Sequence, residues 1–301
     1  MAGATATTHA TVEANGVCLH VARRGDGPRA LLLLHGWPEF WFTWEPLMGR
    51  LAARGFATLA PDLRGFGESE KPDPGPSDRA TAAVHADDLL ALLDALGLDR
   101  VGVVAHDVGA IVTQVLARRA PERFAGLALF DTPYPGMGAR WAAPEQLREI
   151  WYQGFHLLPF AADLVGASRE TCRAYIGHFL RHWGAGNPAA FDGPVLEAWV
   201  DNFMAPGNLQ GGFNWYIGAA EDRLRVVRGE APALPAITVP TLVRWGALDP
   251  ILRVAWADRL GEHFADLDFA PFEGVGHFPH REAPDAAAAT VADFFDARWP
   301  A

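Results

Sequence analysis

The chain has 301 residues and carries 36 acidic side chains against 25 Lys and Arg, a formal net charge of −11, and half of its residues are hydrophobic. This length and balance exclude a disordered chain and a small domain that needs disulfide staples. The acidic sum argues against a nucleic-acid partner, which would require a local excess of basic residues.

The same composition bears on location. The longest apolar run near the start, residues 30–34, is far too short for a membrane span. Residues 1–16 contain no basic region followed by an apolar stretch, so we expect no secretory signal. Two cysteines, Cys18 and Cys172, fit a reducing compartment better than a disulfide framework. We therefore expect a soluble cytoplasmic protein without a membrane partner, and we leave a homodimer open.

In chain order, the first half alternates short apolar runs with stretches of helix length. Four runs are predicted strands, over residues 30–34, 57–60, 101–105 and 126–130. Three helices are predicted between them, over residues 44–54, 79–96 and 110–119. Apolar runs without alternation are typical of a parallel sheet covered on both faces. Two N-terminal runs flank Asn15-Gly16, which predicts an antiparallel hairpin. The pattern indicates an α/β fold with a mostly parallel, doubly wound sheet.

This alternation stops near residue 135. Residues 136–236 are rich in Trp, Phe, His and Gly and read as helices with broken loops. Strands then resume at 241–245 and 267–272, with helices at 253–264 and 283–298. A helical insertion into such a sheet predicts a lid over the carboxyl ends of the strands, where these sheets bind ligands. We expect an α/β core of residues 1–135 and 237–301 and a helical cap of residues 136–236.

The strongest chemical signal lies where the strand at 101–105 runs into a helix. Ala105, Asp107 and Gly109 form a small–x–acid–x–small pattern, which is typical of a nucleophile elbow with Asp in place of the more common Ser. Ala105 stands where that pattern usually has Gly. A carboxylate is ionised at neutral pH and can attack a saturated carbon without a base, leaving an alkyl ester on the enzyme.

Cleavage of that ester requires a general base, an acid that orients it and an oxyanion hole. His277 follows the last strand, and Asp249 lies beyond the strand before it, which gives the chain order expected of α/β-hydrolases. Asp131 also lies beyond a strand end and stays open as the alternative acid. The backbone N–H groups of Trp37 and Val108 would form the hole.

Two longer motifs resemble those of the epoxide hydrolases of the α/β-hydrolase fold. They are His-Gly-Trp-Pro-Glu-Phe-Trp at residues 35–41 and Asp-Leu-Arg-Gly-Phe-Gly-Glu-Ser-Glu-Lys-Pro at residues 62–72. The resemblance covers about residues 27–299. Tyr152 and Tyr216 lie in segments similar to those that supply the paired tyrosines of these enzymes. The resemblance implies that both phenols bind the epoxide oxygen during ring opening. It also implies a small apolar epoxide and water as substrates, and no cofactor or metal.

Haloalkane and haloacetate dehalogenases use the same nucleophile and are the alternative enzyme class. Haloalkane dehalogenases place a halide-binding Trp directly after the nucleophile. Haloacetate dehalogenases place Arg at that position and again one helical turn later. This chain has Val108 and Ile111 at those positions, and Tyr152-Gln153 where their lid carries a His-Trp pair. A non-catalytic binding protein is the alternative from another class, because fold alone does not give function. The complete set of nucleophile, acid and base argues against it.

The remaining polar candidates receive structural roles. His106 is expected to pack beside the nucleophile, and Glu39 to be a solvated side chain or a structural ion-pair partner. His178 and His182 have the i, i+4 spacing of metal ligands on a predicted helix. They lack the intervening Glu and a third ligand, so no metal site is predicted there.

Overall fold

The computed structural model describes residues 6–300, and eight strands in this part of the chain form one sheet in the order β1-β2-β4-β3-β5-β6-β7-β8. The predicted core ranges and the segment screened for a signal extend to residues 1–5 and 301, which lie outside the described residues. β1 and β2 form the predicted antiparallel hairpin, β2 runs antiparallel to β4, and the other neighbours run parallel. The strands span Thr8–Ala14 (β1), Val17–Arg24 (β2), Arg29–Leu34 (β3), Phe56–Pro61 (β4), Val101–His106 (β5), Phe124–Phe130 (β6), Thr241–Gly246 (β7) and Leu267–Phe272 (β8).

Helices connect the strands and fill the segment between β6 and β7. The core helices are Glu45–Ala53 (α1), Ala82–Ala95 (α2), Val108–Arg119 (α3), Pro279–Glu282 (α10) and Pro284–Arg298 (α11). Those between β6 and β7 are Leu147–Phe155 (α4), Ala161–Val165 (α5), Arg169–Trp183 (α6), Pro194–Met204 (α7), Asn208–Gly218 (α8) and Ala220–Arg228 (α9). Six 3-10 helices complete the described chain: Trp41–Trp44 (η1), Pro121–Arg123 (η2), Pro135–Ala142 (η3), Pro144–Gln146 (η4), Pro188–Phe191 (η5) and Val254–Glu262 (η6). Within residues 6–300, none of these helices has the length and apolar character of a membrane span.

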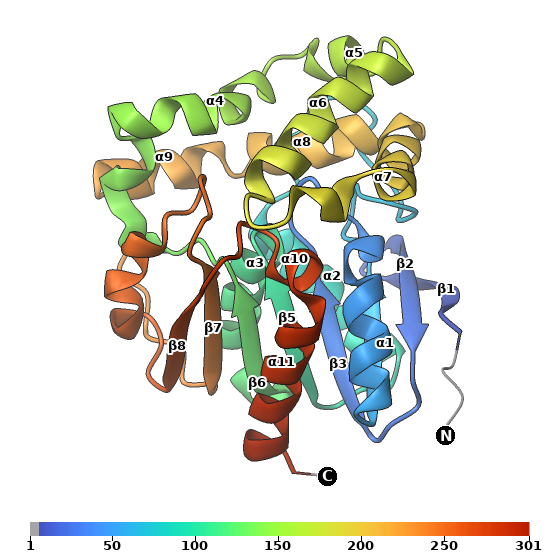
Figure 1. The fold of residues 1–301 in the computed structure, drawn as a ribbon, viewed down its shortest axis with the longest axis vertical. Coiled ribbons are helices and arrows are strands. Elements are labelled where there is room, and N and C mark those ends of the chain that lie inside the picture. Colours follow the sequence, from blue (N-terminus) through green and yellow to red (C-terminus); the bar gives the residue numbers. More distant parts are fainter. Residues whose placement is uncertain (1–5, 301) are drawn as a thin grey trace.

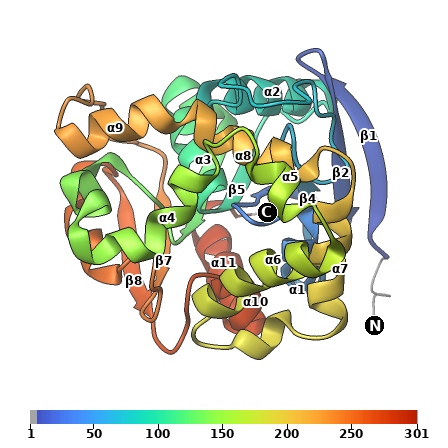
Figure 2. The ribbon, with the colours of Figure 1, turned by 90° about the horizontal axis from the view of Figure 1, so that it is seen from above.

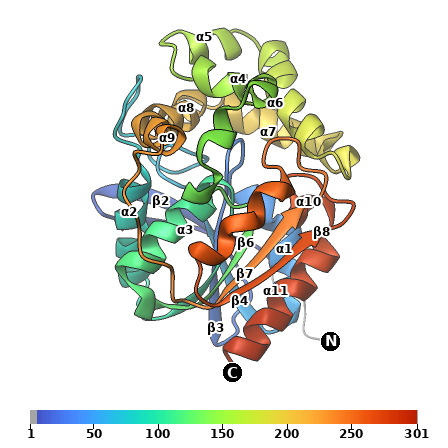
Figure 3. The same cartoon turned by 90° about the vertical axis from the view of Figure 1, so that its left-hand side faces the viewer.

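The central strands are buried along their whole length because helices cover both faces of the sheet. Every residue of β3, β5 and β6 is buried. Side chains alternate between the two faces of a strand. Leu32 and Leu34 therefore join the apolar cluster of α2 and α3, whereas Leu31 and Leu33 join that of α1 and α11. Figure 3 shows the sheet between these two helical layers. The predicted α/β fold class is confirmed.

The segment between β6 and β7 forms a helical lid. Figure 1 shows α4 to α9 above the carboxyl ends of the parallel strands, and Figure 2, from above, shows them crossing over the core. Two close contacts bind lid to core. Trp199 on α7 donates from Nε1 to the carbonyl oxygen of Pro38 at 2.7 Å. Gly211 on α8 lies so near Gly65 that a Cβ would come within 1.8 Å of the Gly65 oxygen. The lid covers the predicted range 136–236, whose limits as a domain stay a prediction.

The sheet reverses its direction of growth between β3 and β5. After β3 the chain adds β4 on one side, and then returns to add β5 on the other side. The loops that leave β3 and β5 diverge at such a point and open a crevice at the carboxyl edge of the sheet. Trp37 follows β3 and Asp107 follows β5. The topology alone therefore brings these two residues to the place where a ligand would bind.

One predicted helix has a different form. Residues 253–264 were expected to form a regular helix, but the described segment is the 3-10 helix η6. The Tyr134 hydroxyl bridges two backbone groups of this segment. It donates to the carbonyl oxygen of Trp256 at 2.5 Å and accepts from the N–H of Arg259 at 3.2 Å. A regular helix would pair both groups with its own backbone, so this contact from another segment accompanies the irregular form.

Candidate active site

Asp107 occupies a strained turn between β5 and α3. Its φ of 47° and ψ of −112° lie where residues other than glycine are rare. The turn is tight because α3 lies close to the sheet: a Cβ on Gly109 would come within 2.3 Å of the Leu34 carbonyl oxygen. Asp107 is partly exposed, whereas the residues of β5 before it are buried. This is the strand–turn–helix geometry of a nucleophile elbow.

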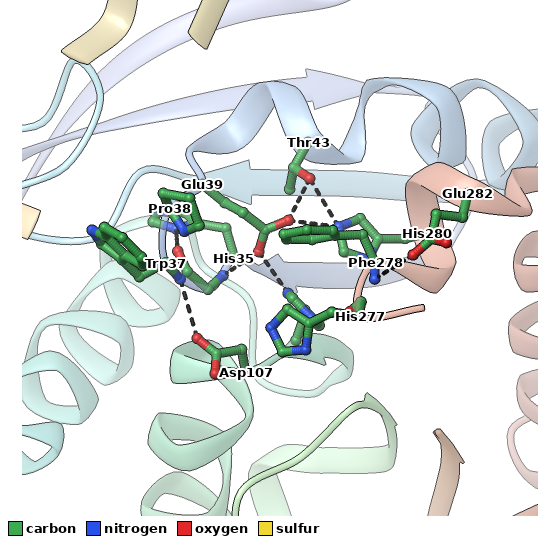
Figure 4. A network of polar contacts seen from close by, with 12 residues as sticks. His35, Trp37, Pro38, Glu39, Thr43, Asp107, His277, Phe278, His280 and Glu282 are labelled. Carbon is green, nitrogen blue, oxygen red and sulfur yellow. Dashed lines mark hydrogen bonds and ion pairs between the residues drawn. The ribbon is translucent and has the colours of Figure 1, made fainter. Parts of the chain in front are cut away.

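The loop after β3 contacts the Asp107 carboxylate. The backbone N–H of Trp37 donates to Asp107 Oδ1 at 3.2 Å (Figure 4). The neighbouring residue must be glycine, because a Cβ on Gly36 would come within 2.7 Å of the Asp107 Cβ. Val108 is the first residue of α3, where backbone N–H groups have no partner within the helix. Both predicted oxyanion donors therefore adjoin Asp107, and their role remains a prediction.

His277 and Asp249 are joined by a short hydrogen bond. His277 Nδ1 donates to Asp249 Oδ2 at 2.7 Å, and both side chains are buried. The other carboxylate oxygen of Asp249 accepts the N–H groups of Ile251 and Leu252 at 2.8 and 2.9 Å, which fixes the carboxylate in place. Burial by itself lowers the pKa of His277, but the carboxylates of Asp249 and then Asp107 outweigh it, so the pKa is raised. With Nδ1 held, the Nε2 of His277 is the nitrogen that can accept a proton.

Asp131, the alternative acid, has a different environment. It follows β6 with a φ of 40°, and its Oδ1 accepts the N–H of Gly246 at 2.9 Å. Its Oδ2 is buried and has no hydrogen-bond partner among the described residues. One oxygen of Asp131, one of Asp249 and a nitrogen of His277 all lie within 4.8 Å of one another. Burial, followed by the charge of Asp249, raises the pKa of Asp131 well above its usual range. Asp131 is therefore the member of the carboxyl pair that holds a proton more tightly, and Asp249 accepts the hydrogen bond from His277.

The two lid tyrosines lie around the Trp37 ring. Tyr152 on α4 stacks on Trp37 with ring centroids 5.1 Å apart, and Tyr216 on α8 meets it edge-on at 5.5 Å. The tyrosine rings are 5.4 Å apart and nearly perpendicular. Burial and then the Asp107 carboxylate raise the pKa of Tyr152 above its usual range, and burial, followed by Tyr152 and Asp107, does the same for Tyr216. Both phenols are thus protonated at neutral pH.

A cavity of about 240 Å³ joins these groups beneath the lid. Asp107, Tyr152 and Tyr216 all line it. Most of its other walls are apolar, and they include Ile111 and Met137. Apolar walls with a few convergent polar groups are typical of a site for a small organic ligand. The arrangement brings one carboxylate and two phenols to a single cavity.

A fully buried polar network lies behind the nucleophile (Figure 4). Glu39 accepts from Thr43 Oγ1 at 2.5 Å and from the Gly36 N–H at 2.7 Å, and it contacts His106 Nδ1 at 2.6 Å and His280 Nε2 at 2.7 Å. Burial alone would raise the pKa of Glu39, but the two histidines outweigh it and hold that pKa well below its usual range. Glu39 is therefore a buried carboxylate and not a solvated one.

His106 lies between two hydrogen-bond acceptors. Its Nδ1 faces the Glu39 carboxylate, and its Nε2 faces the carbonyl oxygen of His277 at 2.7 Å. Both partners can only accept, so each ring nitrogen is placed to serve as a donor. Burial lowers the pKa of His280 to about 4, which leaves that ring neutral. The Glu39–His106 pair thus joins the oxyanion loop, the strand that carries Asp107 and the loop of His277.

In each of two groups of buried side chains, three atoms of the kind that can bind a metal ion lie close together. They are Glu39, His106 and His280, and Asp131, Asp249 and His277. Hydrogen bonds within each group already occupy most of these atoms. His178 and His182 stack on α6 with ring centroids 5.4 Å apart. Among the described residues they belong to no such group, and His182 contacts Glu149 instead.

Comparison with known proteins places this geometry in a family. The model of the alpha/beta hydrolase fold matches residues 29–284. The soluble epoxide hydrolase of Corynebacterium sp. (strain C12) is 31% identical over 300 residues, covering 97% of this chain and 98% of that protein. Epoxide hydrolase 1 of Siraitia grosvenorii is 43% identical over 315 residues, covering 95% and 97%. The chain belongs to the epoxide hydrolase group of the α/β-hydrolase family. The crystal structure of an epoxide hydrolase from Vigna radiata is similar too, with a TM-score of 0.80, 27% identity and coverage of 97% and 98%.

Three residues of this hydrolase went unrecognised as parts of the site. The buried role of Glu39 could have been inferred, because a carboxylate among Trp, Pro and Phe at residues 37–42 has little access to water. Gln153 beside Tyr152 and Arg223 on α9 contact the tyrosines directly. Arg223 gave no signal, because it stands among other arginines on a charged helix, none of whose residues is fully buried.

The carboxyl pair of this hydrolase leads to a prediction about stability. Asp131→Asn keeps an acceptor for the Gly246 N–H and leaves the bond between His277 and Asp249 untouched, so activity should change little. Burial raises the pKa of Asp131 above its unfolded value, so wild-type stability should fall as pH rises toward the folded pKa. Asn cannot ionise, so the variant should gain in melting temperature relative to wild type as the pH rises above the ordinary Asp pKa of about 4. Melting curves that fall in parallel for both proteins would contradict a raised pKa for Asp131.

Proposed function

We propose that this enzyme converts a small apolar epoxide and water into a vicinal diol, through an ester on Asp107. The observation that carries the proposal is the shared cavity, in which the carboxylate of Asp107 lies with the two phenols of Tyr152 and Tyr216. The similarity to proteins named epoxide hydrolases supports it.

In the first step the Asp107 carboxylate attacks a ring carbon. A C–O bond forms to Asp107, the ring C–O bond breaks, and the ring oxygen leaves with the electron pair as an alkoxide. Tyr152 or Tyr216 donates its proton to that oxygen. Because burial keeps both phenols protonated, the donors are in place before the charge develops.

In the second step His277 takes a proton from water, and the hydroxide attacks the ester carbonyl of Asp107. The N–H groups of Trp37 and Val108 stabilise the oxyanion of the tetrahedral intermediate. Collapse of that intermediate breaks the ester C–O bond, and the leaving alkoxide takes the proton held by His277 to give the diol. The second proton of the water is lost as the Asp107 carboxylate is restored, and it returns the tyrosinate to the phenol. Alkylation also removes the negative charge of Asp107, which helps to raise the pKa of His277. The pKa of His277 therefore falls in the ester intermediate, when a neutral imidazole is needed as base.

The same nucleophile could displace a halide, but the cavity is poorly equipped for it. Val108 and Ile111 line the cavity where dehalogenases similar to this chain carry Trp or Arg. Neither side chain can donate a hydrogen bond to a halide or a carboxylate.

A panel of substrates tests the reaction class. Styrene oxide, an alkyl epoxide, chloroacetate, fluoroacetate and an aryl ester are assayed side by side for diol, halide and phenol. We expect diol from at least one epoxide and turnover of the haloacetates slower by about 10² or more, since neither the Val108 nor the Ile111 side chain can hydrogen-bond the leaving halide or the substrate carboxylate. Halide release from the haloacetates without diol from either epoxide would overturn the proposal.

A further inference from the structure

Arg223 projects from the lid helix α9 into the same cavity, yet its charge has no counter-ion. It lines the cavity with Asp107 and the two tyrosines. Within the described part of the chain, no carboxylate forms an ion pair with it, whereas Arg225, two residues on, pairs with Glu221. Burial lowers the pKa of Arg223, against the opposing effect of Tyr216 and Tyr152. A partly buried cation without a carboxylate partner destabilises the fold unless its hydrogen bonds compensate for the lost contact with water.

Those hydrogen bonds lead to the phenols. Arg223 Nη1 donates to Gln153 Oε1, and Nη2 donates to the backbone oxygen of Tyr216 at 3.2 Å. Trp141 Nε1 donates to the same Gln153 oxygen at 3.1 Å. With its oxygen held by two donors, Gln153 turns its amide nitrogen to Tyr152 and donates to the phenol oxygen at 3.2 Å. The Tyr152 oxygen therefore acts as acceptor, and its own proton remains for a ligand.

We propose that Arg223 is a positioning residue for ring opening, which acts through Gln153 to orient and polarise Tyr152 as the proton donor to the ring oxygen. The inference rests on the proposed epoxide hydrolysis. Hydrogen bonds in a chain strengthen one another, and a cation at the far end adds to the effect. Burial raises the pKa of Tyr152, and the charge of Arg223 acts in the opposite direction. Arg223 thereby offsets part of the loss of acidity that the dry cavity imposes on the phenol.

The test compares two epoxides that differ in how basic the alkoxide becomes. Ester formation is timed by quenched intact-mass measurements in a His277→Gln chain, where only the first step proceeds. The probes are 1,2-epoxypropane and its analogue 1,1,1-trifluoro-2,3-epoxypropane, whose alkoxide is much less basic and needs less proton donation. Arg223→Gln should slow alkylation by epoxypropane about tenfold and by the trifluoro analogue about twofold or less, as general-acid catalysis requires.

Three further variants separate this role from folding. Arg225→Gln removes the same charge from the exposed ion pair and should leave both rates unchanged. Arg223→Lys keeps the charge and should restore part of the loss. In a Gln153→Leu chain, Arg223→Gln should have a smaller effect than in the chain with Gln153, because the link is already broken.

The outcomes are distinguishable. If the His277→Gln chain without any substitution in the lid forms no ester with any epoxide, the proposed function fails, and the inference fails with it. If esters form but Arg223→Gln slows alkylation by both epoxides equally, or by neither, the epoxide chemistry stands and the role proposed for Arg223 is refuted. A greater loss for epoxypropane than for its trifluoro analogue, with partial rescue by Lys, supports it.

Discussion

Replacing His277 by Gln should make the enzyme trap its own intermediate. Asp107 needs no base for its attack, so ring opening should continue, while water activation should be lost. With a reactive epoxide, the protein should gain the mass of one substrate molecule per chain instead of turning over. Steady-state diol formation should fall by about 10⁶, the loss found when the histidine of a serine-type triad is removed. Intact-mass spectrometry followed by peptide mapping measures the adduct and should find it on Asp107.

Two companion variants make this test specific. Asp249→Asn keeps His277 but loses the acceptor for its Nδ1 at 2.7 Å. It should accumulate the same ester and release it slowly, because the imidazole is present but poorly oriented. Asp107→Asn should show no adduct while the amide remains intact. An adduct on another residue, or no adduct in His277→Gln despite turnover by the wild type, would refute the two-step mechanism.

The sequence permitted these assignments because the residues lie at strand ends. A continuous apolar run located β5, strand patterns at 241–245 and 267–272 located β7 and β8, and the residues just beyond a parallel strand must lie at one edge of the sheet. Asp107, Asp249 and His277 were predicted from that placement, from the elbow pattern around Asp107 and from the chain order of nucleophile, acid and base. Asp249 and His277 are joined by a hydrogen bond, and the charge of Asp107 acts on His277. Strand order and local motifs were therefore enough to select side chains that lie together in the fold.

Other features depend on tertiary contacts that periodicity does not record. The position of His106 between two acceptors depends on groups 67 and 171 residues away in the chain. The irregular backbone of η6 is bonded to the Tyr134 hydroxyl, which comes from the loop after β6. The sequence left the choice between Asp131 and Asp249 open, because both lie beyond strand ends. The direction of each carboxyl group distinguishes them, and direction is set by packing.

Removing both lid phenols should nearly abolish ring opening. Tyr152→Phe or Tyr216→Phe alone leaves one donor for the ring oxygen, so each should slow ester formation only in part. A single donor in a dry site is worth about 10² to 10³ in rate. The double change removes both phenols, and their two factors multiply. It should therefore reduce the rate of alkylation by about 10⁴ or more. Ester formation in the His277→Gln chain measures this step without interference from hydrolysis.

The two single changes should also be unequal. Tyr152 receives the amide of Gln153 at 3.2 Å, and through it the charge of Arg223, whereas Tyr216 contacts Arg223 through its backbone oxygen. Tyr152→Phe should therefore slow alkylation more than Tyr216→Phe. Phe keeps the ring that packs on Trp37, 5.1 Å from Tyr152 and 5.5 Å from Tyr216, so melting temperatures should change little. This separates lost proton donation from lost packing. Wild-type alkylation rates in the double variant, with an unchanged melting temperature, would show that the ring oxygen takes its proton from another source.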